Sequence, residues 1–355
     1  MELFETITQM GHERVLFCHK PESGLKAIIA IHDLGLGVAM GATRMWPYAS
    51  EADALRDVLR LSRGMTYKAA CANIPVGGAK AVILCDPKDK TEAILRDYGR
   101  FVESLQGTFV TGQDVNLSPQ DVRIISQETN HVVGLSTESK GPAPITAMGV
   151  FQGIRAALEF KLPERKFGEL TVAVQGLGNV GQNLCQLLYN RGAKLFVSDI
   201  SREKTWLAQR LYNATIVEPN EIYALDVDIF APCALGGILN SSTIPSIQAP
   251  IIAGCANNQL LEEKTDARAL TEKGILYCPD YVINAGGLID VYYEKIGYEP
   301  AKAEQQLKNI HETLWEIFQT AQDKNVTTNQ AAFELAQKRI ATAKESLKVT
   351  IGAQG

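Results

Sequence analysis

Residues 170–199 constrain the fold more than any other part of this 355-residue chain. The apolar run 170–175 predicts a buried strand, which leads into Gly176-Leu-Gly178-Asn-Val-Gly181. A helix is expected next, from about Val180 to Asn190, and a second strand, 194–198, ends at Asp199. A glycine-rich turn between a strand and a helix, followed by an acid at the end of the next strand, is typical of a βαβ unit that binds a dinucleotide.

The residue types in this unit have separate roles. Gly176 allows the tight turn, Gly178 lets a pyrophosphate approach the backbone, and Gly181 lets the helix pack on the strand. The amino end of the helix favours phosphate charge. Asp199 can accept hydrogen bonds from ribose hydroxyls and would repel a 2′-phosphate, which favours NAD, although Arg202 leaves some tolerance of NADP open.

Strand-like and helix-like segments continue to alternate after residue 200, which predicts a doubly wound parallel sheet. Polar turns follow two of these strands, at Asn257 and Asn284. Ligands of such sheets bind beyond the carboxyl ends of the strands, so these amides are candidate nicotinamide and substrate contacts. Asparagine is also common in plain turns, which is the alternative. The predicted strands are 214–217, 227–231, 251–253 and 275–278, and the helices between them include 201–212 and 262–273.

Two lysines, Lys68 and Lys80, flank an apolar segment that has no carboxylate before Asp86. Apolar surroundings disfavour the charged form of lysine, so a neutral amine becomes available for proton transfer. Gly77-Gly78 gives the backbone unusual freedom and lets a ligand come close. The alternative is a turn followed by a buried strand, 81–85, with lysines that reach solvent.

A helix is predicted to begin at Ser50, which forms a capping box with Asp53. Its apolar stripe carries Lys68 on the inward face, so this lysine needs an anionic partner from the protein or from a ligand. Arg44, in the glycine-rich segment 35–46, is interpreted as structural rather than as a contact for a carboxylate.

Asp114 follows a predicted strand, 108–111, and lies near a glycine. The carboxyl end of a strand is where α/β folds often place reactive groups. The alternative is that Asp114 caps the helix that Ser118-Pro119 opens.

The composition is that of a globular protein, with 46% apolar residues, 21% charged residues and a net charge of −5. No basic run predicts a nucleic-acid or membrane partner, and the amino terminus lacks the pattern of a signal peptide, so a cytoplasmic location is expected. The seven cysteines form no C-x-x-C pair and are interpreted as thiols in a reducing compartment. The five histidines lack the spacing of metal ligands, so no metal site is expected.

The segment Ile74-x-x-Gly77-Gly78-Ala79-Lys80-x-Val82-x-x-x-Asp86-Pro87 resembles the active-site signature of the glutamate/leucine/phenylalanine/valine dehydrogenase family at every defined position. The length of the chain and the residues of its motifs resemble those of the leucine/phenylalanine branch of this family. Other motifs similar to that family occur in order, at residues 41–47, 64–68, 113–115, 142–146, 174–180, 231–236, 256–259 and 279–287.

This resemblance implies a two-domain α/β protein. A substrate-binding and oligomerisation domain would occupy residues 1–138, and an NAD-binding Rossmann domain residues 139–327, with a C-terminal helix, 328–355, packing back on the first domain. The Ser-, Gly- and Pro-rich segment 136–146 is predicted to be the linker about which the domains close, with a helix from about Ala147. A homo-oligomer is implied, with dimer and octamer both open.

The resemblance also implies a reaction, the reversible NAD-dependent oxidative deamination of an L-amino acid to its 2-oxo acid, ammonia and NADH. Lys68 matches the residue that holds the substrate carboxylate, Lys80 the catalytic lysine that activates water, and Asp114 the acid that exchanges protons with the amine. The candidate substrate-binding residues are Met40, Gly41, Met65, Lys68, Ala69, Ile74, Val110, Asn257, Leu288, Ile289 and Val291. The candidate cofactor-binding residues are Thr146, Gly176, Gly178, Asn179, Val180, Gly181, Asp199, Ala256 and Asn284.

The apolar character of the candidate pocket predicts an apolar substrate side chain, and no cation is placed to receive a side-chain carboxylate, which argues against glutamate. Met40 is adaptable and suits an aromatic ring. The sequence at residues 40–44 and 71–75 is also similar to that of the cyanobacterial tryptophan dehydrogenases of this family. L-tryptophan is therefore expected first and L-phenylalanine next, with leucine or another branched-chain amino acid as the alternative.

Two other classes of function fit the sequence less well. A 2-hydroxy-acid dehydrogenase would normally use a catalytic histidine paired with a carboxylate, and no histidine lies in a matching motif. An NAD-sensing regulatory protein without catalysis would be expected to have lost Lys80 or Asp114, and both are present.

Overall fold

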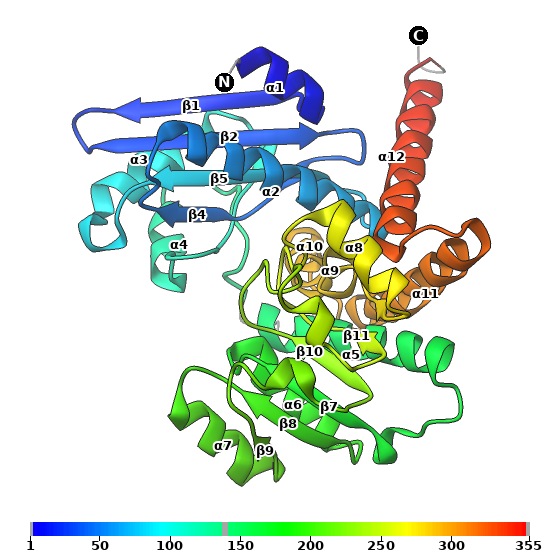
Figure 1. Ribbon diagram of the computed structural model, residues 1–355. Coiled ribbons are helices and arrows are strands. Elements are labelled where there is room, and N and C mark those ends of the chain that lie inside the picture. The colour runs from blue at the N-terminus through cyan, green and yellow to red at the C-terminus, as the bar shows by residue number, and fades with distance from the viewer. Residues whose placement is uncertain (1–2, 137–140, 353–355) are drawn as a thin grey trace. The chain divides into compact units, whose positions relative to one another are not determined.

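The computed structural model describes residues 3–136 and 141–352, and the chain divides into two compact units. Unit 1 comprises Met1–Glu138, Glu294–Gly297 and Ala336–Gly355, and unit 2 comprises Ser139–Tyr293 and Tyr298–Leu335. Both units contain a sheet with helices around it (Figure 1), so the predicted α/β class is confirmed.

Unit 1 is built on a six-stranded sheet in the order β1-β2-β5-β3-β6, with β4 also paired to β5. The first three strands pair antiparallel, whereas β3 and β4 run parallel to β5. The strands are β1 (Arg14–Lys20), β2 (Leu25–Asp33), β3 (Ala39–Met40), β4 (Thr43–Trp46), β5 (Gly77–Leu84) and β6 (Phe109–Val110). The helices are α1 (Leu3–Met10), α2 (Glu51–Cys71), α3 (Glu92–Glu103) and α4 (Pro119–Ile125).

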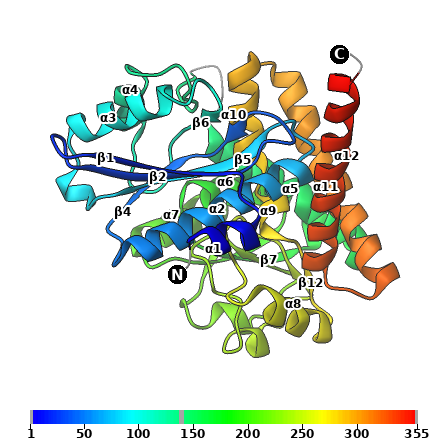
Figure 2. The ribbon, with the colours of Figure 1, turned by 90° about the horizontal axis from the view of Figure 1, so that it is seen from above.

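Helices cover both faces of this sheet (Figure 2). Alternate residues of β2 point to opposite faces. Ile29 and its neighbours on one face pack with Leu95 and Tyr98 of α3, whereas Ile28 on the other face packs with Leu59 of α2. Strand β5 lies next to β2, so a side chain at its centre is buried from both sides.

Helix α2 begins as predicted, because the Oγ of Ser50 accepts a hydrogen bond from the Asp53 N–H at 3.1 Å. Its fully buried stripe includes Val58, Leu59, Ser62, Thr66 and Ala69. Lys68 is only half-buried, so it lies at the margin of this stripe and not on its inward centre.

The alternative interpretation of Gly77-Gly78 as a turn is wrong, because both residues belong to β5. A Cβ on Gly77 would lie 2.1 Å from the carbonyl oxygen of Asp33, and one on Gly78 would lie 2.1 Å from Oγ1 of Thr66. Neither glycine has a positive φ. Close approach by the protein's own neighbouring elements, and not backbone freedom, therefore requires glycine here.

Unit 2 contains a parallel six-stranded sheet in the order β12-β11-β10-β7-β8-β9, which confirms the predicted doubly wound sheet. The order reverses between β7 and β10, the position where such folds bind ligands. The strands are β7 (Thr171–Gln175), β8 (Lys194–Ser198), β9 (Thr215–Ile216), β10 (Ile229–Pro232), β11 (Ile251–Ile252) and β12 (Leu276–Tyr277). The helices include α5 (Pro142–Lys161), α6 (Asn179–Tyr189), α7 (Arg202–Tyr212), α8 (Glu263–Glu272), α9 (Asp280–Ile283), α10 (Gly286–Ile296) and α11 (Pro300–Lys324).

The predicted linker 136–146 is wrong in its second half, because α5 begins at Pro142 and not near Ala147. Proline is tolerated in the first turn of a helix, where its missing N–H would have had no intrahelical partner. Gly141 precedes it with φ of +88° and ends the irregular segment. Residues 137–140 of the predicted linker lie outside the described residues.

The last helix, α12 (Thr328–Gly352), contributes residues to both units. Within unit 1, Arg339 Nη1 donates to the carbonyl oxygens of Ala70 and Cys71 at 3.1 and 2.7 Å, at the end of α2. Lys344 forms an ion pair with Asp33 of β2. None of the helices in the described ranges has the length and hydropathy needed to cross a bilayer.

Candidate functional site

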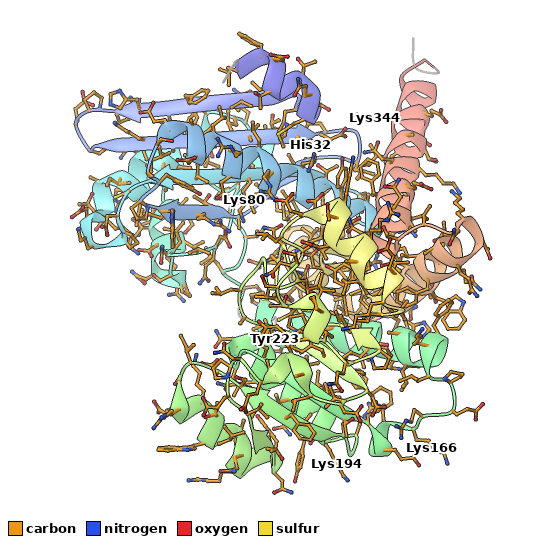
Figure 3. The ribbon with its side chains drawn as sticks, in the orientation of Figure 1. His32, Lys80, Lys166, Lys194, Tyr223 and Lys344 are labelled. Carbon is orange, nitrogen blue, oxygen red and sulfur yellow. The ribbon has the colours of Figure 1, made fainter. Side chains whose placement is uncertain are left out.

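Lys80 and Asp114 form an ion pair inside unit 1. Lys80 lies on β5 (Figure 3), and only 8% of its side chain is exposed, so it does not reach solvent as the alternative interpretation required. Its Nζ lies 2.8 Å from Oδ2 of Asp114, whose side chain is 24% exposed. A buried lysine thus meets a carboxylate that retains access to solvent or to a ligand.

Asp114 does not cap the following helix. Ser118 is the N-cap of α4, and its Oγ accepts a hydrogen bond from the Asp121 N–H at 3.2 Å. Asp121 completes a reciprocal pair, in which its Oδ2 accepts a hydrogen bond from the Ser118 N–H at 2.6 Å. This capping box leaves Asp114 available to Lys80, so the capping interpretation is wrong.

Arg44 extends the ion pair into a network of alternating charge. Its Nε donates to Oδ2 of Asp114 at 3.3 Å, and its Nη1 donates to Oδ2 of Asp57 at 2.9 Å. Tyr48 also donates to Asp57, at 2.6 Å. Arg44 therefore contacts carboxylates, the interpretation that the sequence disfavoured.

Sequence reasoning did not find Asp57. The spacing of Asp57 and Lys68 on α2 was a signal in the sequence. These residues are three helical turns apart and lie within about 20° of each other around the helix axis. The two residues therefore share one face of the helix, and a polar face of this kind could have been identified from the spacing.

The charges around Asp114 determine its protonation state. Burial by itself raises the pKa of Asp114, but the charge and hydrogen bond of Lys80 oppose burial, and so do the charge of Arg44 and the Val115 N–H. Their combined effect is larger, so the pKa lies below its usual value. Asp114 is therefore held as a carboxylate.

Two of the apolar candidates of unit 1, Met40 and Val110, lie in the same sheet as Lys80. Met40 of β3 is in register with Gly78 on one side and with Val110 of β6 on the other. A Cβ on Gly41 would lie 1.6 Å from the carbonyl oxygen of Ala79, so only glycine fits there. Met40, Ala69, Ile74 and Val110 are buried, and Met65 is half-buried. Their role as substrate contacts stays a prediction.

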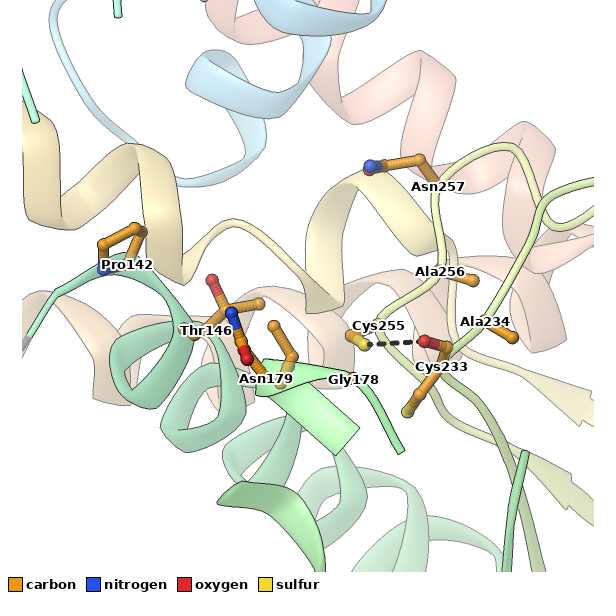
Figure 4. Close-up of a pocket in the computed structure, with 11 residues that line it drawn as sticks. Pro142, Thr146, Gly178, Asn179, Cys233, Ala234, Cys255, Ala256 and Asn257 are labelled. Atoms are coloured by element: carbon orange, nitrogen blue, oxygen red, sulfur yellow. Dashed lines mark hydrogen bonds between the residues drawn. The ribbon is translucent and has the colours of Figure 1, made fainter. Parts of the chain in front are cut away.

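Unit 2 contains a pocket at the carboxyl ends of β7, β10 and β11 (Figure 4), where the strand order reverses. It brings together six of the residues that the sequence singled out, from three separate segments. These residues are Thr146, Gly178, Asn179, Val180, Ala256 and Asn257, and the lining also includes Pro142, Ala143, Cys233, Ala234 and Cys255.

The geometry of the glycine-rich turn fits a dinucleotide. Gly176 has φ of +97°, and a Cβ on Gly181 would lie 2.0 Å from the Gly176 carbonyl oxygen. A Cβ on Gly178 would meet no described atom within 4 Å, so this glycine borders open space. Among the described residues, no side chain caps the amino end of α6, whose N–H groups can therefore receive an anion.

Asp199 is fixed beside this turn by two backbone groups. Its Oδ2 accepts a hydrogen bond from the Leu177 N–H at 2.7 Å, and its Oδ1 accepts one from the Ser201 N–H at 2.8 Å. A carboxylate has about four acceptor sites, so Asp199 can still accept from a ribose hydroxyl.

Asn284 links the pocket to α9 and has an unused acceptor. Its Nδ2 donates to Oδ1 of Asn257 at 2.8 Å and to the Cys255 carbonyl oxygen at 3.1 Å. Its Oδ1 is buried and has no hydrogen-bond partner among the described residues. An unsatisfied buried acceptor costs about 1–3 kcal/mol, so a ligand N–H or O–H would be favoured at this position.

Three further candidates lie on α10. Leu288 and Ile289 are buried within unit 2, and Val291 is half-buried. They are not among the residues that line the pocket of Figure 4, so their role as substrate contacts stays a prediction. Within the described ranges, no group of three or more His, Cys, Asp or Glu side chains is arranged to hold a metal ion.

Family models and known proteins match nearly the whole chain. The model for the Glu/Leu/Phe/Val dehydrogenase dimerisation domain matches residues 12–131, and that for Glutamate/Leucine/Phenylalanine/Valine dehydrogenase matches residues 139–202 and 196–347. L-tryptophan dehydrogenase of Nostoc punctiforme is 62% identical over 353 residues, which cover 99% of this chain and 100% of that protein. Leucine dehydrogenase of Geobacillus stearothermophilus is 48% identical over 350 residues, covering 98% and 95%.

A crystal structure of L-tryptophan dehydrogenase from Nostoc punctiforme is also similar, with a TM-score of 0.86 and 61% identity. The match covers 96% of this chain and 99% of that one. Both the motifs and the fold thus agree with the family models, which confirms the resemblance read from the sequence. The chain therefore belongs to the Glu/Leu/Phe/Val dehydrogenase family.

Proposed function

We propose that this protein catalyses the reversible NAD-dependent oxidative deamination of an apolar L-amino acid, with L-tryptophan as the first candidate and L-phenylalanine as the next. The buried Lys80–Asp114 pair is the observation that carries this proposal. A buried amine next to a carboxylate can move protons between water and a substrate amine. The overall reaction converts the amino acid, NAD⁺ and water into a 2-oxo acid, ammonium, NADH and a proton.

The residues of unit 1 would have separate roles in substrate binding and in proton transfer. Lys68 would hold the substrate carboxylate by charge. NAD, when bound, accepts the hydride that leaves the substrate Cα, which converts the substrate amine into an iminium. Lys80, as a neutral amine, would then remove a proton from the water that attacks this iminium. Asp114, at 2.8 Å from Lys80 Nζ, would pass a proton to the departing amine.

The residues of unit 2 would hold the cofactor. The amino end of α6 and the glycine-rich turn suit the pyrophosphate, and the free acceptor of Asn284 suits an amide or hydroxyl donor. Asp199 favours NAD over NADP, because its carboxylate would repel a 2′-phosphate.

Similarity supports the choice of substrate. The relative named L-tryptophan dehydrogenase has the higher identity of the two compared above, which favours tryptophan over leucine. Leucine, or another branched-chain amino acid, is the second candidate. A regulatory protein that binds NAD without catalysis is the alternative outside the enzymes, and the intact Lys80–Asp114 pair argues against it.

We also propose a homo-oligomer, either a dimer or an octamer, because the model that matches residues 12–131 describes a dimerisation domain. A cytoplasmic location is proposed because all seven cysteines are free thiols, as is usual in a reducing compartment.

A single spectrophotometric assay tests the proposed activity and the choice of substrate. The purified protein is mixed with NAD⁺ and one of a panel of L-amino acids, and NADH is followed at 340 nm. The highest kcat/KM is expected with tryptophan. A preference for leucine would replace tryptophan by the second candidate, and absence of NADH with every amino acid would contradict the dehydrogenase assignment.

A further inference from the structure

Two cysteines follow neighbouring parallel strands of unit 2. Ile229 and Phe230 of β10 pair with Ile251 and Ile252 of β11, and Cys233 and Cys255 each lie three residues beyond the last of these pairs. The two segments remain adjacent beyond the strands, because the Ala256 N–H donates to the Pro232 carbonyl oxygen at 3.0 Å.

The expected spacing of these two residues suits a disulfide. Neighbouring strands lie about 4.8 Å apart. Disulfide-bonded cysteines have Cα atoms about 4.4–6.8 Å apart. If this spacing continues beyond the two strands, a bond between Cys233 and Cys255 would need rotation of the side chains and a shift of the loop that carries Cys255.

Both side chains lie in the same pocket. Cys233 and Cys255 line the pocket of Figure 4, and Sγ of Cys255 lies 4.0 Å from the Cys233 carbonyl oxygen. Both residues are partly exposed, whereas Cys71, Cys185 and Cys278 are buried. A small oxidant that enters the pocket can thus reach both thiols.

The pKa of the Cys233 thiol is shifted in the opposite direction from the pKa values of the partly exposed thiols of Cys18 and Cys85. A hydrogen bond from the Cys255 thiol is the largest influence on Cys233, and it lowers the pKa of the Cys233 thiol against the opposing effect of burial. Burial instead raises the pKa of Cys18 and of Cys85. The thiolate is the reactive form, so oxidation should begin at Cys233.

We propose that Cys233 and Cys255 are a redox-sensitive dithiol, which a hydroperoxide oxidises to a disulfide that closes the pocket to the dinucleotide. The statement about the dinucleotide rests on the proposed function, whereas the disulfide itself does not. This would make dehydrogenase activity respond reversibly to oxidants.

The oxidation proceeds in two steps. The Cys233 thiol loses its proton, and the thiolate attacks one oxygen of the hydroperoxide. The O–O bond breaks, the leaving oxygen takes up that proton to become water or an alcohol, and a sulfenic acid remains on Cys233. The Cys255 sulfur then attacks the Cys233 sulfur, and the S–O bond breaks, with the hydroxide leaving as water after taking the Cys255 proton. The two sulfurs lose two electrons in total, which reduce the hydroperoxide, and a dithiol reductant reverses the change.

Closure of the pocket follows from how tightly the two loops pack. A Cβ on Gly236 would lie 2.6 Å from the Asn257 carbonyl oxygen, so the loops after β10 and β11 are already in contact. Drawing Cys255 toward Cys233 would displace Ala256 and Asn257 and disturb the Asn257–Asn284 hydrogen bond. The dissociation constant for NADH is expected to rise at least about tenfold, which corresponds to about 1.4 kcal/mol.

The test treats the full-length protein with hydrogen peroxide and makes two independent measurements. Mass spectrometry of a non-reducing digest is expected to find a peptide that links Cys233 to Cys255, and dithiothreitol should remove it. NADH fluorescence is expected to show weaker binding after oxidation and recovery after reduction. The matched variants are Cys255→Ser, in which peroxide should produce no linked peptide, and Cys85→Ser, in which the wild-type response to peroxide should persist.

The outcomes separate the disulfide from the proposed function. Absence of the linked peptide, with peroxide consumed at other cysteines, would overturn the dithiol. A linked peptide with unchanged NADH affinity would overturn the closure of the pocket. If the reduced protein does not bind NADH at all, the proposed function fails and so does the closure, whereas the linked peptide still decides the dithiol.

Discussion

The Nζ of Lys80 lies 2.8 Å from Oδ2 of Asp114, within unit 1. Arg44 donates to the same oxygen at 3.3 Å, so two cations share one carboxylate. Asp114 thus has a second charged partner besides Lys80, and removal of either cation alone would not leave this partly buried carboxylate unpaired, which would be costly.

Replacing Arg44 should change how stability depends on pH. The pKa of Asp114 lies below its usual value of 3.8, so its ion pairs stabilise the fold fully above that pH and lose their effect as the pH falls through the lowered pKa. Arg44→Gln should therefore destabilise most near neutral pH, and the difference from wild type should narrow in acid. Urea unfolding from pH 7 down to pH values below 3.8, in wild-type and Asp114→Asn backgrounds, measures this.

Two controls accompany that experiment. The narrowing of the difference in stability should be smaller in the Asp114→Asn background, where only the Arg44–Asp57 pair can still titrate. Arg56→Gln, which removes a mostly exposed partner of Asp53, should have a small effect at every pH. A pH-independent destabilisation by Arg44→Gln would contradict the assigned role.

Lys80→Ala should abolish most turnover without loss of the fold. Asp114 would retain Arg44 as a partner, so no carboxylate is stranded. Loss of a positioned proton carrier should lower kcat by about 10²–10⁴-fold. Steady-state rates at 340 nm and NADH titration by fluorescence separate chemistry from cofactor binding, which should be retained. Lys88→Ala, at an exposed ion pair, is the matched control, and equal kcat in the two variants would refute the assignment.

Lys68→Ala should act mainly on substrate affinity. A charged hydrogen bond to the substrate carboxylate contributes about 1.5–3 kcal/mol, so KM for the amino acid should rise by about 10–150-fold. KM for NAD should change little. Lys68→Arg, which restores the charge, should recover part of the loss. An unchanged KM for the amino acid in Lys68→Ala would exclude a role in carboxylate binding.

The sequence was a good guide where local patterns decide the structure. The strand, glycine turn and acid of residues 170–199 predicted β7, α6 and β8 to within a residue or two. Ser50 predicted the start of α2 because an N-cap is a local interaction. The family motifs also placed Lys80 and Asp114 among the candidates, and the structure joins them.

Contacts between distant segments were not predictable in the same way. The sequence disfavoured Arg44 as a carboxylate ligand because Asp57 and Asp114 come beside it only when β4, α2 and the segment after β6 are assembled. The glycines at 77 and 78 were interpreted as giving backbone freedom or room for a ligand, since their crowding by Asp33 and Thr66 depends on tertiary packing. Such contacts have no local signature.

Asp199→Asn should increase the use of NADP. Asparagine can still accept one of the two backbone hydrogen bonds that fix residue 199, but it no longer repels a 2′-phosphate. The ratio of kcat/KM with NADP to that with NAD should rise about tenfold or more, equivalent to about 1.4 kcal/mol. Adding Arg202→Gln should reduce the gain if the arginine attracts the phosphate. Asp226→Asn, at an exposed acid of unit 2, should leave the ratio unchanged, and an unchanged ratio in Asp199→Asn would contradict the role in cofactor choice.

Glu294→Gln should loosen the backbone just before residue 137. The Glu294 carboxylate accepts hydrogen bonds from three consecutive N–H groups, Gly134 at 2.8 Å, Leu135 at 2.9 Å and Ser136 at 3.0 Å. A glutamine amide group would direct N–H toward N–H at one or more of these positions, so a destabilisation of about 1–3 kcal/mol is expected. Urea unfolding measures it, and hydrogen exchange of the amides at 134–136 should speed up. Glu299→Gln, at an exposed pair with Lys302, is the control. Unchanged exchange in Glu294→Gln would show that the carboxylate does not hold this segment in solution.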